Sequence, residues 1–286
     1  MRRNFADVLK SADIDVHNEY LKIYELLFGK TISTSTGKKI SLHDIFGAYF
    51  LGFYFRETCL SIEEFDTIHN FRFDEDPKDF CIADLVSICE YLHNMLIGYQ
   101  SAQSSPMTES LYMKYPEIRE MFLIMQIHTI MEKIGYEQSR KDDFIIYIEK
   151  SPIADSLVET KTIPDNMSYR LINYNHYSMK GNIDGKKDLL IQLATLLEPR
   201  RSTLKLIDSS LENDLFFLFN NANLRHNNVN PTDASKYQAY IASMSNDDLE
   251  ELYDLVYQMC LLAFQELELS EKKDIINEFK EAAQMK

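Results

Sequence analysis

Amide, guanidinium and imidazole groups are concentrated in one stretch of this 286-residue chain, residues 220–231 (NNANLRHNNVNP). Six of its first eleven residues are Asn, and Arg225 and His226 stand side by side near its centre. A guanidinium can hold a phosphate through two parallel hydrogen bonds, and an imidazole with a pKa near neutrality can move a proton. Amide groups between two apolar segments are costly to bury unless they are hydrogen-bonded. We therefore predict that the functional site lies in this stretch.

Helical spacing predicts the elements that position this stretch. Apolar residues recur three or four positions apart over 202–224 and predict one helix there, at Leu204, Ile207, Leu211, Leu215, Leu218 and Ala222. One more step of three reaches Arg225, so we expect this helix to carry Arg225 along its packing face. A helix over 186–198 precedes it. A long helix from about 246 to 268, opened by Asn246-Asp247-Asp248, and a last helix over 270–284 follow it.

A helix that ends in Arg, a polar loop and a long second helix resemble the C-terminal half of HEPN domains. These are helical nucleotide-binding and ribonuclease domains of prokaryotic toxins and abortive-infection systems, and the resemblance covers about residues 186–286. Their motif is an Arg, a polar residue, and a His four to six positions after the Arg. Arg225 and His226 match its first half. The second half departs from it, because Asn230 stands where that His is expected.

The resemblance implies a protein of anti-phage defence that binds RNA or cleaves it without a metal. It implies that Arg225 holds the scissile phosphate and that His226 is the local acid–base group. Amides nearby would bind or position the substrate, namely those of Asn223, Asn227, Asn228 and Asn230. It also implies a homodimer, in which two motifs share one cleft.

A local excess of basic residues precedes the predicted site helix, and its positive charge is compatible with the binding of a polyanion. We take four of them as candidate substrate-binding residues: Lys186, Lys187, Arg200 and Arg201. The alternative is an ordinary solvated helix face.

A second function stays open for the whole site. Asn-rich segments often cap helices, because Asn tolerates left-handed backbone and bonds to nearby amides. Arg225 would then pair with a carboxylate of the same chain. In that case the C-terminal part is a catalytically inactive helical scaffold or protein-interaction module. Whether Arg225 lies exposed in a cleft or in an intramolecular salt bridge distinguishes the two hypotheses.

The fold class predicted for the chain is all-α, in two helical parts. The N-terminal part, residues 1–165, has no assigned role, and its helices are expected at 16–28, 42–60, 80–99 and 116–135. The β-like run FIIYI at 144–148 predicts a small β element. A domain boundary is predicted at 165–180, so that the C-terminal helical domain spans 180–286.

Composition excludes several classes of function. The formal net charge of −15 opposes non-specific coating of DNA or RNA. Glycine-rich phosphate loops are absent and the seven His show no metal-ligand spacing, so we expect neither a cofactor nor a metal. The four Cys form no CxxC pair, which is typical of free thiols in a reducing cytoplasm. With no signal-peptide pattern and no long apolar run, we expect a cytoplasmic protein without a membrane span.

Overall fold

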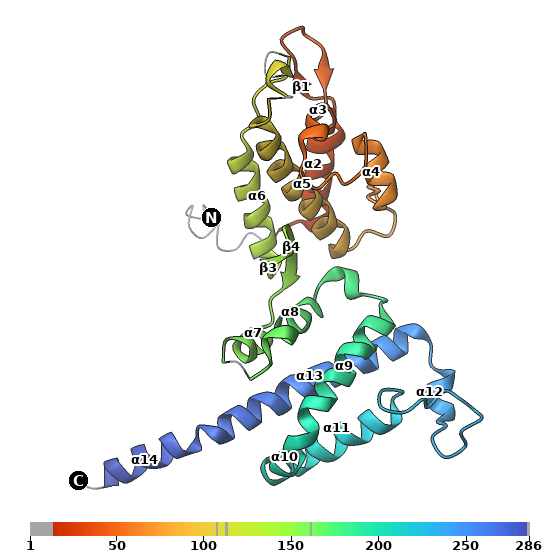
Figure 1. The fold of residues 1–286 in the computed structure, drawn as a ribbon, viewed down its shortest axis with the longest axis vertical. Helices are drawn as coiled ribbons and strands as arrows, with labels where there is room; N and C mark the ends of the chain where they lie inside the picture. Colours follow the sequence, from red (N-terminus) through yellow and green to blue (C-terminus); the bar gives the residue numbers. More distant parts are fainter. Residues whose placement is uncertain (1–13, 107, 112–113, 161, 285–286) are drawn as a thin grey trace, which may run out of the picture. The chain divides into compact units, whose positions relative to one another are not determined.

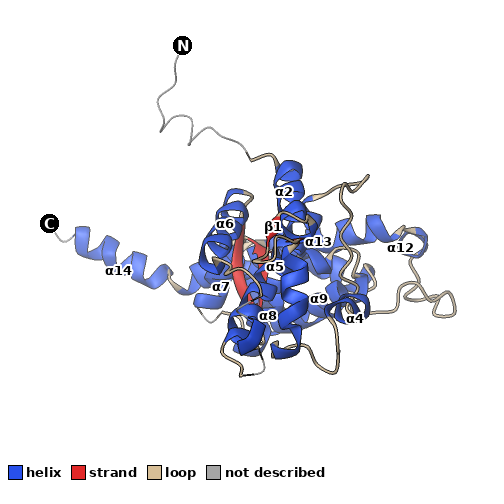
Figure 2. Cartoon of the chain, turned by 90° about the horizontal axis from the view of Figure 1, so that it is seen from above, coloured by secondary structure: helices blue, strands red, loops and turns tan. Residues whose placement is uncertain are grey.

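The computed structural model describes residues 14–106, 108–111, 114–160 and 162–284. The chain divides into two compact units, Met1–Glu149 and Lys150–Lys286. Helices dominate both units and the strands are few and short (Figure 1, Figure 2). The predicted all-α class is therefore confirmed, together with the small β element near residues 144–148. In the described part of the chain, no helix is both long enough and apolar enough to cross a membrane.

The first unit is built around α5 (Ile82–Gln103), which has buried side chains on all its faces. The other elements of the unit are α2 (Val16–Phe28), β1 (Ile32–Ser33), β2 (Lys39–Ile40), α3 (Leu42–Tyr49), the 3-10 turn Phe50–Gly52, α4 (Ile62–Ile68), the 3-10 turn Glu109–Leu111, α6 (Glu120–Lys133), β3 (Tyr136–Lys141) and β4 (Phe144–Glu149). The central helix α5 packs against α2, α3, α6 and β4.

The helix predicted at 42–60 is wrong in its second half. It begins as expected, at a capping box between Ser41 and Asp44, but α3 ends at Tyr49 and a 3-10 turn follows. The chain then passes so close to α5 that a Cβ on Gly98 would lie 2.7 Å from the rings of Phe53 and Phe55. A continued helix would turn these two rings to nearly opposite sides, whereas the turn over residues 53–56 places both rings on α5.

The β3–β4 hairpin runs in register from Tyr136↔Glu149 to Lys141↔Phe144. Side chains of α5 satisfy the other edge of β4. Asn94 accepts the N–H of Ile145 at 2.9 Å and donates to its carbonyl at 2.8 Å, and Glu90 accepts the N–H of Tyr147 at 2.6 Å. A buried strand edge thus finds its partners on a helix instead of on a third strand.

The second unit is built around α13 (Asn246–Glu271), which packs against α7 (Pro152–Glu159), α9 (Ile183–Leu197), α10 (Arg201–Ile207) and α11 (Ser209–Asn221). Ser245 caps α13 and acidic residues occupy its first turn, which confirms the predicted start. The remaining elements of the unit are α8 (Asp165–Asn173), the 3-10 turn Tyr177–Met179, the 3-10 turn Glu198–Arg200, α12 (Ala239–Ser243) and α14 (Lys273–Gln284).

The second unit begins earlier than the boundary predicted at 165–180. Pro152 is the first residue of α7 and Pro164 caps α8, so both prolines stand at helix starts. Both helices contribute to the core of the second unit, through Ala154, Leu157 and Leu171 among others.

The single helix predicted over 202–224 is two helices, α10 and α11. Asp208 breaks it, with φ −138° and ψ 98°, and its carboxylate accepts the N–H groups of Ser210 and Leu211 at 2.9 Å each. An apolar stripe with unbroken spacing can cross such a capped junction, because both helices pack against α13.

Candidate functional site

The predicted site lies in the loop that joins α11 to α12. α11 ends at Asn221, and Asn223 has a φ of +57°, in the left-handed region that Asn tolerates well. The N–H of Arg225 donates back to the carbonyl of Phe219 at 3.0 Å. The chain therefore folds over the end of α11, and Arg225 does not continue the helix as its spacing had predicted.

Asn228 holds this loop together. Its side chain is buried, and its Oδ1 accepts the N–H of Asn223 at 2.8 Å. Its Nδ2 donates to the carbonyls of Asn220 and Lys236, at 3.1 and 2.7 Å. Its own carbonyl accepts the N–H of Gln238 at 2.8 Å. The amide that was predicted to bind substrate thus cross-links the two ends of the loop.

The other Asn candidates lie at different places around the loop. The Oδ1 of Asn223 faces the N–H of Asn228 at 3.3 Å, so these two residues bond reciprocally. Asn230, which stands where the HEPN motif has its His, accepts the N–H and the hydroxyl of Thr232 at 3.0 and 2.8 Å. It therefore closes a tight turn. Asn227 is exposed.

The guanidinium of Arg225 points back against α9 and α11. Its Nη2 donates to the carbonyl of Ala194 at 3.1 Å and pairs with the carboxylate of Glu198. Its Cζ lies 5.2 Å from the ring centre of Phe216 and 5.1 Å from that of Phe219. The side chain is 22% exposed. Arg225 is thus held in an intramolecular salt bridge over two aromatic rings.

A second guanidinium meets the same ring. The Cζ of Arg201 lies 4.4 Å from the centre of Phe216, and its Nε is 2.5 Å from the Oε1 of Glu212. Glu212 is fully buried, and its Oε2 has no hydrogen-bond partner within the described part of the chain. We call Glu198, Arg201, Glu212, Phe216 and Arg225 the Arg225 corner. Two cations and two carboxylates balance each other there around one aromatic ring.

His226 follows Arg225 and is half-buried. Its carbonyl accepts the N–H of Asn228 at 3.0 Å. Its imidazole makes no hydrogen bond or ion pair with any described residue. A general base is usually oriented by a hydrogen-bonded partner, and the loop supplies none for His226.

The predicted basic patch is divided between the two ends of α9. Lys186, in the first turn, is buried, and its Nζ lies 2.7 Å from Glu250 and 2.6 Å from Asp254. The next residue, Lys187, is half-buried, and this burial lowers the pKa of its amine. Lys186, which was predicted to bind substrate, is therefore buried in the packing between α9 and α13, where two carboxylates already pair with it.

Arg200 and Arg201 lie at the other end of α9, roughly 20 Å away at 1.5 Å per residue. Arg200 is partly exposed and lies 3.9 Å from Glu271. The structure thus brings Arg201 beside Arg225, at the ring of Phe216, whereas Arg200 lies near Glu271 and both lysines lie outside this group.

The sequence interpretation missed Glu198, Glu212 and Phe216. A signal for the last two was present, because Glu212, Phe216 and Phe219 are spaced by four and three and share one helix face. A carboxylate on a packing face is rare unless it is paired, and the spacing around Glu212 does not identify its partner. Nothing local to Glu198 indicated that it would meet Arg225.

Within the residues that the structure describes, no group of three or more His, Cys, Asp or Glu could hold a metal ion. Comparisons with protein-family models, with curated proteins and with solved structures found no match to this chain.

Proposed function

We propose that the second unit is a helical protein-interaction module, in which the Arg225 corner has a structural role. One observation carries this proposal: the guanidinium of Arg225 is already bound to the carbonyl of Ala194 and the carboxylate of Glu198. A phosphate could bind there only by displacing Glu198, which would leave that carboxylate beside a new anion.

The rest of the loop supports the same function. The Asn228 amide is buried and used for bonds within the loop, and Asn230 closes a turn. A catalytic site keeps donors directed at the position that the reacting atoms will occupy. Here the donors are directed at the chain itself.

The first test compares Arg225→Ala with Arg200→Ala in the full chain. Arg225→Ala should lower the free energy of unfolding by about 2 kcal/mol, because it removes charge-assisted hydrogen bonds and the contact with two rings. Arg200→Ala should change it by less than about 0.5 kcal/mol, because its ion pair is long and solvent-exposed. Urea denaturation followed by circular dichroism measures both values.

The same proteins are incubated with single-stranded RNA, with and without EDTA. The wild type should leave the RNA intact in both buffers. RNA cleavage by the wild type that Arg225→Ala abolishes, while the fold remains, would contradict the interaction-module proposal.

A second candidate function is an RNA-binding or RNA-cleaving protein of abortive-infection type, a cytoplasmic homodimer. Two guanidiniums, those of Arg201 and Arg225, lie close together in the Arg225 corner, and this favours the second candidate. The Arg201 side chain is 46% exposed and that of Glu198 is 50% exposed, so solvent reaches this corner. An exposed Glu198 can release Arg225 to a phosphate. In this alternative Arg201→Ala and Arg225→Ala both weaken RNA binding at least tenfold, and light scattering gives twice the chain mass. RNA binding that neither variant changes would exclude this site.

A further inference from the structure

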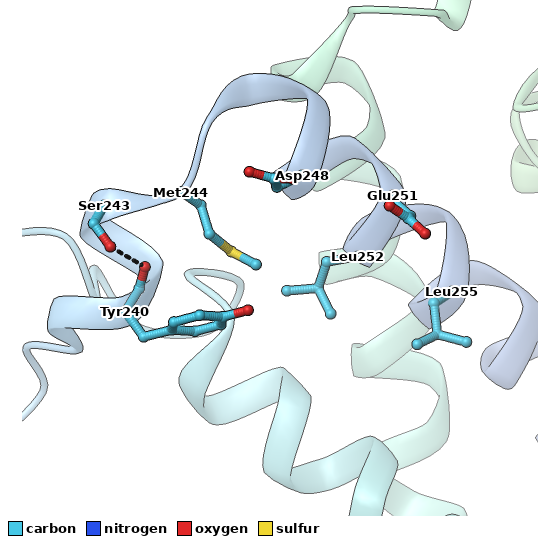
Figure 3. Close-up of a pocket in the computed structure, with 7 residues that line it drawn as sticks. All are labelled: Tyr240, Ser243, Met244, Asp248, Glu251, Leu252 and Leu255. Carbon is cyan, nitrogen blue, oxygen red and sulfur yellow. Dashed lines mark hydrogen bonds between the residues drawn. The ribbon is translucent and has the colours of Figure 1, made fainter.

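A groove open to solvent lies between α12 and the first turns of α13, with a volume of about 510 Å³ (Figure 3). Its floor is apolar. Tyr240 and Met244, from α12 and its end, point toward Leu252 of α13, and Leu255 lies one turn further along α13 (Figure 3). Tyr240 is 73% exposed and Leu255 is 54% exposed. Large apolar side chains gathered at such exposure mark an interaction site more often than isolated ones do.

The rim of the groove is acidic. Asp248 and Glu251 extend from the same face of α13 as Leu252 and Leu255, at helical steps of three, one and three (Figure 3). All seven lining residues are neutral or acidic. Ser245 donates to Asp248 as part of the cap of α13, whereas Glu251 lies beyond the first turn, where the helix dipole offsets its charge least.

We propose that this groove binds a partner protein through a short amphipathic helix with an apolar face and flanking Lys or Arg residues. The proposal rests on the interaction-module function and names its partner class. α12 offers Tyr240 and Ser243, its C-terminal cap offers Met244, and α13 offers its own stripe, so a third helix can pack between them. The stripe from Asp248 to Leu255 is roughly 10 Å long, which corresponds to about two turns of a bound helix.

Charge selects this occupant over the alternatives. A second copy that docked through the same face would bring Asp248 and Glu251 against their own equivalents in a symmetric contact. Like charges placed opposite each other destabilise such a contact. An anionic membrane surface would be repelled in the same way. A basic helix gains from both the apolar floor and the acidic rim.

The test uses three synthetic peptides of about 14 residues, which is about four helical turns, with fluorescence anisotropy as the readout. The first has Leu on one helix face and Lys elsewhere. The second has Glu in place of Lys. The third has the composition of the first with its Leu residues spread around the helix.

Each peptide is titrated into the wild-type chain and into two matched pairs of variants. Glu251→Lys is compared with Glu75→Lys, an equal charge change in an exposed turn of the first unit. Leu255→Ser is compared with Leu206→Ser, at an exposed Leu on α10. Circular dichroism verifies that every variant is folded.

The first peptide should bind at least tenfold tighter than the other two. Glu251→Lys and Leu255→Ser should each weaken it at least fivefold, while the two control variants stay within twofold of the wild type. Equal loss in Glu251→Lys and Glu75→Lys, or equal binding of the first and third peptides, would mean non-specific attraction and overturn the proposal. The proposal would also be overturned if the wild-type chain binds no peptide but self-associates, and if Leu255→Ser abolishes that self-association. RNA cleavage that depends on Arg225 would contradict the interaction-module function, whereas the peptide titrations test only the groove. Failure of the proposed function and failure of the groove proposal are therefore distinguishable.

Discussion

Asn228 illustrates how a single amide can define a loop that has no regular structure. Its side chain bonds to Asn223, before it in the chain, and to Lys236, after it, while it remains buried. A hydroxyl or carboxylate could not replace it, because the site needs one acceptor and two donors in one plane. The density of Asn in this stretch therefore reflects backbone organisation at least at this position.

Replacement of Asn228 by Ala should destabilise the second unit by about 3 kcal/mol, because several buried backbone groups lose their partners. The exposed neighbour offers a matched control, and Asn227→Ala should change the free energy of unfolding by less than about 0.5 kcal/mol. Urea denaturation of both variants provides the measurement. Equal stability of the two would show that the hydrogen bonds of Asn228 do not hold the loop.

At the scale of elements, the junction between α5 and β4 concentrates buried polar groups in the first unit. The Nδ1 of His93 lies 2.8 Å from the hydroxyl of Tyr147, and its ring packs edge-on against that of His128 at 5.5 Å. Burial, with a smaller contribution from His128, lowers the pKa of His93 to about 4. The half-buried His128 thus takes part in packing against His93 and Tyr147.

This low pKa predicts how stability changes with pH. The folded chain keeps His93 neutral, whereas in the unfolded chain it has an ordinary pKa of about 6.5. The unfolded state therefore binds the proton first, so the contribution of His93 is complete above pH ~6.5 and is lost as the pH falls toward ~4. The loss is on the order of 3 kcal/mol. His93→Gln should remove that part of the pH dependence in denaturation curves.

Carboxylates also titrate in this range, so the comparison between variants decides the outcome. His17→Gln, a change at a partly exposed His that pairs with Asp76, is the matched control for the removal of an imidazole. If His93→Gln keeps the wild-type pH dependence, His93 is not the group responsible.

The junction between α10 and α11 depends on one capping residue. The carboxylate of Asp208 accepts two N–H groups of the first turn of α11. Asp208→Ala should therefore cost about 1 kcal/mol of unfolding free energy, and Asp208→Asn should retain most of it. Thermal unfolding of the two variants tests this, and a wild-type Tm for Asp208→Ala would argue against the cap.

At the scale of the whole molecule, the division at 149/150 determines which fragments can fold. The core of the second unit includes Leu157 from α7 and Leu171 and Tyr174 from α8 and its end. The stacked rings of Tyr174 and Tyr257, 3.9 Å apart, connect α8 directly to α13.

A fragment of residues 150–286 should therefore unfold cooperatively, with a sharp thermal transition in circular dichroism. A fragment of residues 180–286, which starts at the boundary predicted from sequence, should not, because it exposes the apolar surface that α7 and α8 cover. Cooperative unfolding of the shorter fragment would show that α7 and α8 are dispensable.

Local patterns predicted the helices well and their interruptions poorly. The helices expected at 16–28, 80–99, 116–135, 186–198 and from 246 onward are present within a few residues. The helices expected at 42–60 and 202–224 are interrupted. Their apolar spacing continues past the break, because residues outside a helix can still face the same core, as Phe53 and Phe55 do against Gly98.

The sequence by itself determined the class of fold, the β element at 144–148 and the position of the polar loop. Periodicity, capping residues and the Asn cluster are local, so they can be read without long-range contacts. Only the tertiary structure decided what the charged groups do. Lys186 meets Asp254, 68 positions later, and Arg225 meets Ala194, 31 positions earlier. Whether a cation faces solvent or a carboxylate of its own chain depends on which helices pack together, and no spacing within one segment contains that information.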